Sequence, residues 1–218
     1  MQKEKEKIAK ALKKRWSLKI YKGTLFVFGI FLVAIFFAWG EEYQVLVAGT
    51  ATDSVVISLT VAEIISLSAP DDVTMSPDIF GSGISTGATT WVVETNNSTG
   101  WKLELNADAS PAMRIDSTNY FTDYTEILAG VPEIWNVADT DSEFGFSAEG
   151  SYALSKYSGG TLFEGFSGLT KIKVAEDNEP TPGGGAATTI NFKAEVGINK
   201  NQTAGNYRAT IIATASTL

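Results

Sequence analysis

Residues 89–105 read TTWVVETNNSTGWKLEL and carry the clearest fold signal in the chain. Apolar and polar residues alternate on both sides of the run NNSTG at 96–100, as they do in strands with one buried face. Asn and Gly tolerate the positive φ angles that tight turns need. The residues predicted to face a core are Trp91, Val93, Trp101, Leu103 and Leu105. The stretch therefore predicts a β-hairpin.

The same alternation recurs on both sides of this stretch. Further strands are predicted at Val55–Val61, Phe144–Ala148, Leu169–Ala175, Thr189–Ile198 and Asn206–Ser216. An apolar series also continues through Ile65 and Leu67 as far as Pro70. The inward positions of the last two strands are Ile190, Phe192, Ala194, Val196 and Ile198, then Tyr207, Ala209, Ile211, Ala213 and Ala215. Residues 110–138 show no strong period.

Many short strands separated by turns predict a mainly β fold, a single antiparallel β-sandwich of Ig-like or jelly-roll-like type over residues 54–218. No amphipathic helix of useful length follows residue 40, so a parallel α/β architecture, which needs crossover helices, is excluded. The Pro- and Gly-rich run at 176–187 is predicted to be a loop inside this domain, because the strand after it needs partners from before it.

The first 40 residues predict an export signal. Residues 1–22 hold nine Lys or Arg and two Glu, and residues 23–40 hold no charge. A basic stretch before an apolar run keeps its basic end in the cytoplasm. The apolar run from Tyr21 to Trp39 is 19 residues long, enough as a helix to cross a hydrocarbon core of about 30 Å. We therefore expect a cytoplasmic region at 1–22, a hydrophobic signal or anchor helix at 23–40 and a linker at 41–53.

Retention of this helix and two kinds of cleavage are all compatible with the sequence. Retained, it anchors the protein in the membrane, with interfacial Trp and Tyr residues at its ends. Cleaved as an ordinary signal, it is cut after Gly40 or after Ala51, where small residues flank the site. Cut between Gly23 and Thr24, the chain would resemble a type IV pilin, although residues 24–28 lack the acidic residue usual early in bacterial pilin helices. Each fate places the protein outside the cytoplasm, anchored or secreted.

Composition removes several classes of function. The chain has no Cys and no His, which excludes thiol nucleophiles, imidazole bases, disulfides and ordinary zinc sites. The formal net charge is −8, divided into +7 for residues 1–22 and −15 for the remainder. A body of that charge is unsuited to nucleic acid, whose phosphates need Lys and Arg. We expect no cofactor and no enzymatic activity.

The densest acidic cluster, Asp139, Asp141 and Glu143, is the one candidate metal site. Carboxylates on alternate residues can converge on Ca²⁺ from a loop. A helix–loop–helix calcium site would need Gly at the sixth position and a carboxylate at the twelfth, but Phe144 and Gly150 stand there. A solvated turn is the favoured interpretation.

Other motifs have both a functional and a structural interpretation. Three tryptophans (Trp91, Trp101 and Trp135) would stack on sugars if they were exposed, but the alternation around the first two favours the core. Asn96, Asn97 and Asn201 each begin an N-x-S/T triplet, and turn formation is favoured over glycan attachment. Ser155 and Lys156 are sequence neighbours, which on a strand point to opposite faces and cannot form a dyad.

Two resemblances accompany these patterns. The strand Gly100-Trp101-Lys102-Leu103, followed by the terminal strand at 207–211 (YRATI), resembles part of the WxL domains that attach proteins to Gram-positive cell walls. The second Trp-x-Leu of those domains is absent.

A fuller likeness rests on DSVVISLTVAEIISLSAPDDVTMSP, TTWVVETNNSTGWKLELNADASPAM, TDSEFGFSAEG, ATTINFKAEVG and GNYRATIIATAST. These strings resemble an uncharacterised family of exported β-sandwich surface proteins of small-genome candidate-phylum bacteria. That resemblance implies a surface location and supplies no activity or site residues.

The function expected from the sequence is that of an exported surface protein with a structural or interaction role, displayed on the envelope or built into a surface assembly. The expected partners are the membrane through residues 23–40, copies of the protein itself and envelope components. A module that binds cell wall or glycans and a pilin-like filament subunit are the alternatives.

Overall fold

The computed structural model describes residues 49–168 and 170–218. The predicted basic region 1–22, the predicted helix 23–40 and most of the predicted linker 41–53 lie outside these residues. Within them, no helix is long and apolar enough to cross a membrane. Residues Leu59–Leu218 form one compact unit, whose regular elements are almost all β-strands. The one helical element among its described residues is a single 3-10 turn, η1 (Ser155–Tyr157).

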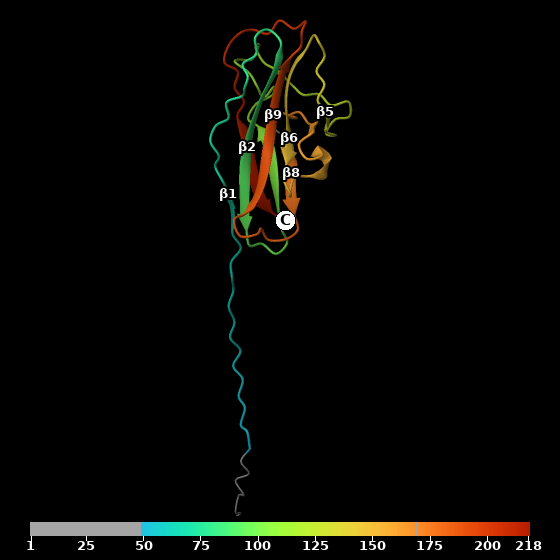
Figure 1. The fold of residues 1–218 in the computed structure, drawn as a ribbon. Coiled ribbons are helices and arrows are strands. Elements are labelled where there is room, and N and C mark those ends of the chain that lie inside the picture. The colour runs from blue at the N-terminus through green and yellow to red at the C-terminus, as the bar shows by residue number, and fades with distance from the viewer. Residues whose placement is uncertain (1–48, 169) are drawn as a thin grey trace, which may run out of the picture. The chain divides into compact units, whose positions relative to one another are not determined.

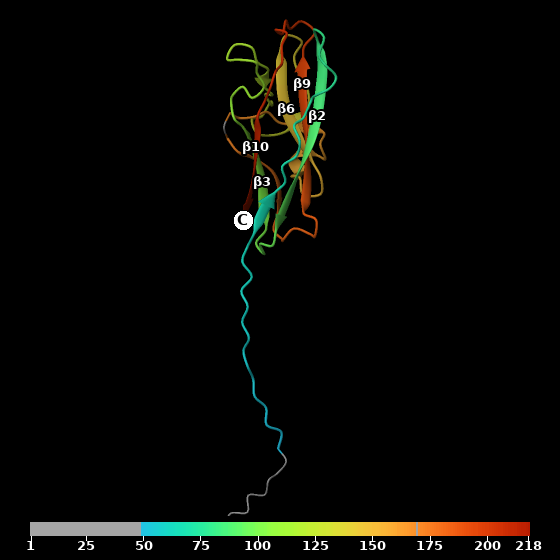
Figure 2. The same cartoon turned by 90° about the vertical axis from the view of Figure 1, so that its left-hand side faces the viewer.

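Strands of this unit form two main sheets (Figure 1). The larger sheet has the strand order β1 (Ile65–Leu67), β2 (Gly83–Thr95), β9 (Ala186–Val196), β6 (Ser142–Glu149) and β4 (Thr122–Asp123). The smaller sheet has the order β10 (Ile211–Thr217), β3 (Trp101–Ala107) and β8 (Ile172–Asp177). A separate pair joins β5 (Glu133–Ile134) to β7 (Leu162–Phe163). Figure 2 shows β3 and β10 in one layer and β2, β6 and β9 in the other, an arrangement consistent with a β-sandwich.

A single hydrophobic core lies between the two layers. Side chains from both main sheets contribute to it, and its fully buried members include Val93, Phe146, Ile190, Trp101, Leu103, Leu105 and Val174. Phe166 fills the space beside two strand aromatics, with its ring centroid 4.6 Å from that of Phe146 and 5.7 Å from that of Phe144. The alternation read from the sequence thus identifies the inward faces of β2, β3 and most of β9 correctly.

The predicted hairpin at 89–105 is wrong, although both of its strands exist. β2 belongs to the larger sheet and β3 to the smaller one, so residues 96–100 carry the chain from one layer to the other. Alternation shows which face of a strand is buried, and two strands that bury their faces in the same core need not be hydrogen-bonded neighbours. The turn needs Gly100, whose φ is +94° and whose missing side chain would collide with the carbonyl oxygen of Asp177.

Most other predicted strands are present with shifted ends. The last predicted strand has an isolated bridge between Arg208 and Arg114 and becomes a regular strand only at Ile211, although Tyr207 and Ala209 still pack against the core. Ile198 was expected to point inward, yet it follows the end of β9 and is exposed. One pairing departs from the antiparallel rule, because β4 runs parallel to β6.

The predicted strand at 55–61 is absent. None of these residues is assigned to a strand, and the five apolar ones are between 73% and 90% exposed. They are Val55, Val56, Ile57, Leu59 and Val61. The residues have the alternation of a half-buried strand but have no partner strand in the described part of the chain.

Candidate functional site

The three candidate calcium ligands lie close in sequence but do not converge. Asp139 and Asp141 are exposed in the turn before β6, whereas Glu143 is half-buried within that strand. The backbone of the turn is bonded to the loop after β9, where the Asn199 N–H donates to the Asp139 carbonyl at 2.7 Å. In the described part of the chain, no three His, Cys, Asp or Glu side chains are grouped so that they could hold a metal ion.

Glu143 is nevertheless an unusual carboxyl group. Partial burial, followed by the negative charges of Asp141, Glu126 and Glu133, raises the pKa of Glu143 to about 7. The sequence marked this residue only as a weak candidate calcium ligand, and the segments that bring Glu126 and Glu133 near it have no periodic signal. A group with this pKa can exchange a proton near neutral pH.

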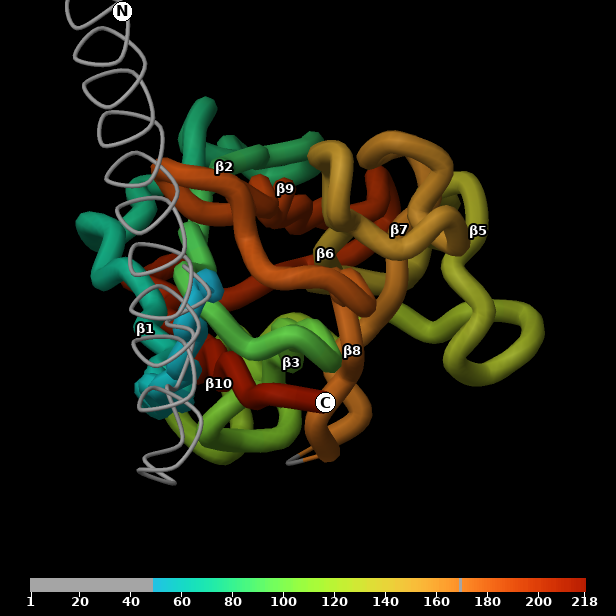
Figure 3. Tube along the Cα trace, turned by 90° about the horizontal axis from the view of Figure 1, so that it is seen from below, coloured from blue at the N-terminus to red at the C-terminus, as the bar shows by residue number. Residues whose placement is uncertain are grey.

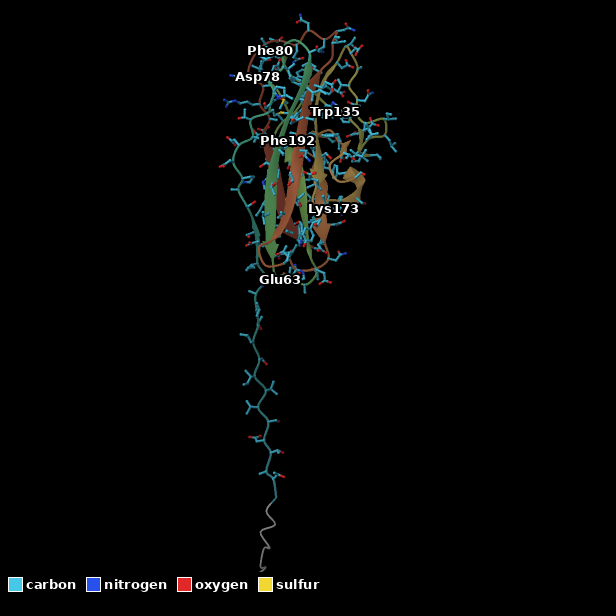
Figure 4. All side chains as sticks on the ribbon, in the orientation of Figure 1. Glu63, Asp78, Phe80, Trp135, Lys173 and Phe192 are labelled. Carbon is cyan, nitrogen blue, oxygen red and sulfur yellow. The ribbon has the colours of Figure 1, made fainter. Side chains whose placement is uncertain are left out.

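A cluster of aromatic and charged side chains covers the outer face of the larger sheet near Glu143. The rings of Tyr124 and Trp135 stack with centroids 4.5 Å apart. Trp135 donates through Nε1 to Glu195 at 2.6 Å, and the Lys193 Nζ lies 5.4 Å from the Trp135 ring and 5.0 Å from that of Phe163. Figure 4 shows Trp135 near the upper part of the strands. Burial raises the pKa of the Tyr124 phenol to about 12.

The close approach of this cluster to the sheet depends on Gly145 in β6. A Cβ at that position would lie 2.8 Å from the Tyr124 Cβ and 3.1 Å from the Trp135 ring. The cluster therefore packs directly against bare backbone. Its members are already engaged with one another, which is the arrangement of a structural layer.

Glu164 is a buried carboxylate that the sequence did not single out. Its Oε2 accepts hydrogen bonds from the Lys156 Nζ at 2.6 Å and from the Tyr157 hydroxyl at 2.8 Å. Burial and the neighbouring Glu164 charge raise the pKa of the Tyr157 phenol. Lys156 thus pairs with a carboxylate, and Ser155 takes no part in the triad. The group satisfies its own charges, as buried ion pairs must.

Trp91 and Trp101 lie where the structural interpretation predicted, and the three asparagines lie in the segment after β2 and in a loop. Trp91 and Trp101 are buried in the core, so they offer no sugar-binding platform. Asn97 is also buried, and its Oδ1 accepts from the backbone N–H of Thr99 at 2.8 Å. The Asn96 side chain is bonded to the chain before β1, and Asn201 is exposed in a loop.

Exposed apolar side chains are grouped in two segments of the described residues in particular. The first is the segment 55–61, whose alternating side chains are in solvent. The second is the loop around β5, where four large apolar side chains are about half-exposed or more: Ile127, Leu128, Val131 and Ile134. Exposed apolar surface of this kind marks an interaction region more often than a catalytic one.

Comparison with protein-family models, with curated proteins and with solved structures gave no significant match to this chain.

Proposed function

We propose that this chain is an exported cell-surface protein with a structural or interaction role and without catalytic activity. In this proposal residues 1–22 stay in the cytoplasm, residues 23–40 form the signal or anchor helix and residues 41–53 the linker. Residues 54–218 then form a single sandwich of Ig-like or jelly-roll-like type outside the membrane. The expected setting is the envelope or an assembly built on it.

The segment 55–61 is the observation that carries this proposal. The described part of the chain buries its core aromatics in one compact unit and supplies no partner strand for residues 55–61, although these have the alternation of a strand. Exposed β-prone apolar segments pair readily with other strands, so such a segment favours a role in which proteins join one another. The −15 charge outside residues 1–22 suits a soluble exterior.

The raised pKa of Glu143 is explained by crowding of like charges and burial, and it does not favour an enzyme over a structural role. The glycan-binding alternative loses its main support, since it needed Trp91 and Trp101 at the surface. The pilin-like alternative depends on the position of cleavage and is decided by the same experiment as the proposal.

That experiment is fractionation of the producing cells followed by the intact mass of the protein. A start at Met1 in the membrane fraction would identify an anchored display protein, and a start at Thr24 a pilin-like subunit. A start at Glu41 or Thr52 would identify a cleaved protein. Full-length protein confined to the cytosolic fraction would overturn the proposal.

A further inference from the structure

We propose that Arg114 and Arg208 form a binding site for a phosphate group, supplied as a free ion or by a lipid headgroup. Such a site would add ligand binding to the proposed function, and it would not depend on export, because it belongs to the folded unit. It is carried by the direct pairing of two arginines, by the charges around them and by the bonds that hold their backbones in place.

The two arginines lie directly opposite each other on antiparallel segments. Arg114 belongs to the segment after β3 and Arg208 to the segment before β10, and Figure 3 shows β3 and β10 side by side in the smaller sheet. The Arg114 N–H donates to the Arg208 carbonyl at 2.9 Å, and the Arg208 N–H donates to the Arg114 carbonyl at 3.0 Å. A pair that exchanges both bonds has its Cα atoms about 5.5 Å apart and its side chains on one face. Both arginine side chains therefore leave the backbone at neighbouring points of one surface.

That surface is the solvent side of the paired segments. Arg114 and Arg208 are exposed, whereas the residues just before them in the chain face inward. Met113 is buried, and Tyr207 packs against the core with its ring centroid 5.0 Å from that of Phe121. A ligand in water can therefore reach both guanidinium groups.

Tyr120 extends this row on the other side of Arg114. It pairs with Arg114 in antiparallel register, and backbone hydrogen bonds of 2.9 Å flank the pair on both sides. Directly opposite residues share a face, and the Tyr120 side chain is 39% exposed there. Two guanidinium groups and one phenol hydroxyl thus lie in a row across three segments.

The described part of the chain does not neutralise the two arginines. They are the two arginines of residues 23–218, in which acidic residues outnumber basic ones by fifteen. None of the ion pairs among the described residues includes either of them. Like charges directly opposite each other destabilise a β-pair. With so many carboxylates in the chain, two such arginines in one pair are best explained by an anion that they bind.

Two carboxylates near the pair leave room for such an anion. The Asp116 carboxylate is engaged in its own turn, where it accepts hydrogen bonds of 2.8 to 3.1 Å from Thr118 and Asn119. The Asp108 N–H donates to the Thr210 carbonyl at 3.0 Å, which places Asp108 diagonally across from Arg208. Asp108 is exposed and forms no ion pair with Arg208. We therefore expect Asp108 to weaken anion binding without preventing it.

The row of donors suits a phosphate group. Guanidinium groups bind oxyanions through pairs of parallel N–H bonds. A carboxylate presents two oxygens in one plane, whereas a phosphate group presents oxygens in several directions and can contact both guanidinium groups and the phenol. The excess of negative charge on the rest of the protein repels polyanions, which favours a single phosphate group over a densely charged polymer.

The backbone of the site is held in place before any ligand binds. Gln202 donates through Nε2 to the Tyr120 carbonyl at 3.0 Å and to the Tyr207 hydroxyl at 2.8 Å. Its Oε1 accepts from the Ser142 hydroxyl at 2.8 Å, which ties this group to β6. A site with a fixed backbone loses less entropy on binding.

Thermal melting and calorimetric titration of the purified full chain in a neutral detergent test the site. At equal ionic strength, inorganic phosphate should raise the melting temperature above its value in chloride, because a ligand of the folded form stabilises it. Arg114→Gln and Arg208→Gln should each weaken phosphate binding about tenfold. Lys102→Gln, opposite Ser216 at the far end of β10, is the matched control and should leave phosphate binding unchanged.

Further variants separate a specific site from a general effect of charge. Arg114→Lys keeps the charge but loses the guanidinium fork, so it should also weaken phosphate binding. Asp108→Asn should strengthen phosphate binding, because it removes a competing carboxylate. In chloride, Arg208→Gln should not lower the melting temperature, since it removes a like-charge pair.

A second titration with glycerophosphocholine, a soluble lipid headgroup, distinguishes the two sources of phosphate. Arginine-dependent binding of both compounds would support a headgroup ligand, and arginine-dependent binding of inorganic phosphate alone would support the free ion.

The inference would be overturned if wild type bound neither compound, or if the Arg114→Gln/Arg208→Gln double variant bound them equally well. A large loss of melting temperature for Arg208→Gln in chloride would also overturn it, because the arginine would then be engaged within the folded chain. None of these outcomes bears on export, so fractionation judges the proposed function separately.

Discussion

Glu143 on β6 lies directly opposite Glu195 on β9, so that two carboxylates share the outer face of the larger sheet on neighbouring strands. Like charges in this relationship destabilise a sheet. Glu195 accepts a hydrogen bond from Trp135. Burial, followed by the charges of Asp141, Glu126 and Glu133, raises the pKa of Glu143 to about 7. The sheet therefore holds a carboxyl group whose protonated form is favoured by folding.

Glu143→Gln should remove a pH-dependent loss of stability. Because the pKa of Glu143 rises on folding from 4.5 to about 7, its favourable contribution is complete below about 4.5 and is lost as pH rises through about 7. The melting temperature of the variant, relative to wild type, should therefore increase between pH 5 and pH 8. Glu179→Gln, in an exposed loop, is the control, and an equally flat difference for both variants would contradict the account.

Gly100→Ala should destabilise the domain strongly. The positive φ alone costs a residue with a side chain about 1–3 kcal/mol, and the added Cβ would also collide with the backbone of β8 at Asp177. Gly183→Ala is the matched control, because a Cβ there meets no atom within 4 Å. Chemical denaturation measures the free energy of unfolding of both variants. A similar loss for the two would show that the turn at 96–100, which connects the sheets, does not need glycine.

Trp101 should tolerate replacement by Phe far better than by Ala. Its ring is fully buried, so Trp101→Ala should cost about 3–5 kcal/mol of unfolding free energy. Its indole Nε1 has no hydrogen-bond partner among residues 49–168 and 170–218, and Trp101→Phe removes that buried donor together with part of the ring. Equal losses of unfolding free energy for the two variants in denaturation experiments would contradict this expectation.

Glu164→Ala should lower the free energy of unfolding by about 3 kcal/mol. This is near the lower end of the range for breaking a buried ion pair, because Lys156 keeps access to solvent. Glu176→Ala breaks the partly exposed ion pair with Lys173, whose Nζ is 2.6 Å from Glu176 Oε2. This change should lower the free energy of unfolding by less than about 1 kcal/mol. Lys173 is the second residue of β8 and is labelled in Figure 4. Thermal melting compares the two, and a larger loss for Glu176→Ala would contradict the assignment of the buried triad.

The sequence predicted the inward faces of the main strands because alternation records burial directly, as at Ile190, Phe192 and Trp101. It could not predict which strands pair, because that depends on how turns such as 96–100 direct the chain. It missed Glu164 and the neighbours of Glu143, which loops without periodicity bring together. The strand predicted at 55–61 is absent for a different reason. The residues there do alternate as in a strand, but the described part of the chain supplies no partner strand.

Surface exposure of the folded domain is the most direct test of the central claim. In cells that produce the full chain, Glu179→Cys provides its sole thiol in an exposed loop, and a membrane-impermeant maleimide reports whether that loop faces the exterior. The account predicts the same extent of labelling on intact cells as after lysis. Labelling that occurs only after lysis would contradict export, and with it the proposal of a surface protein.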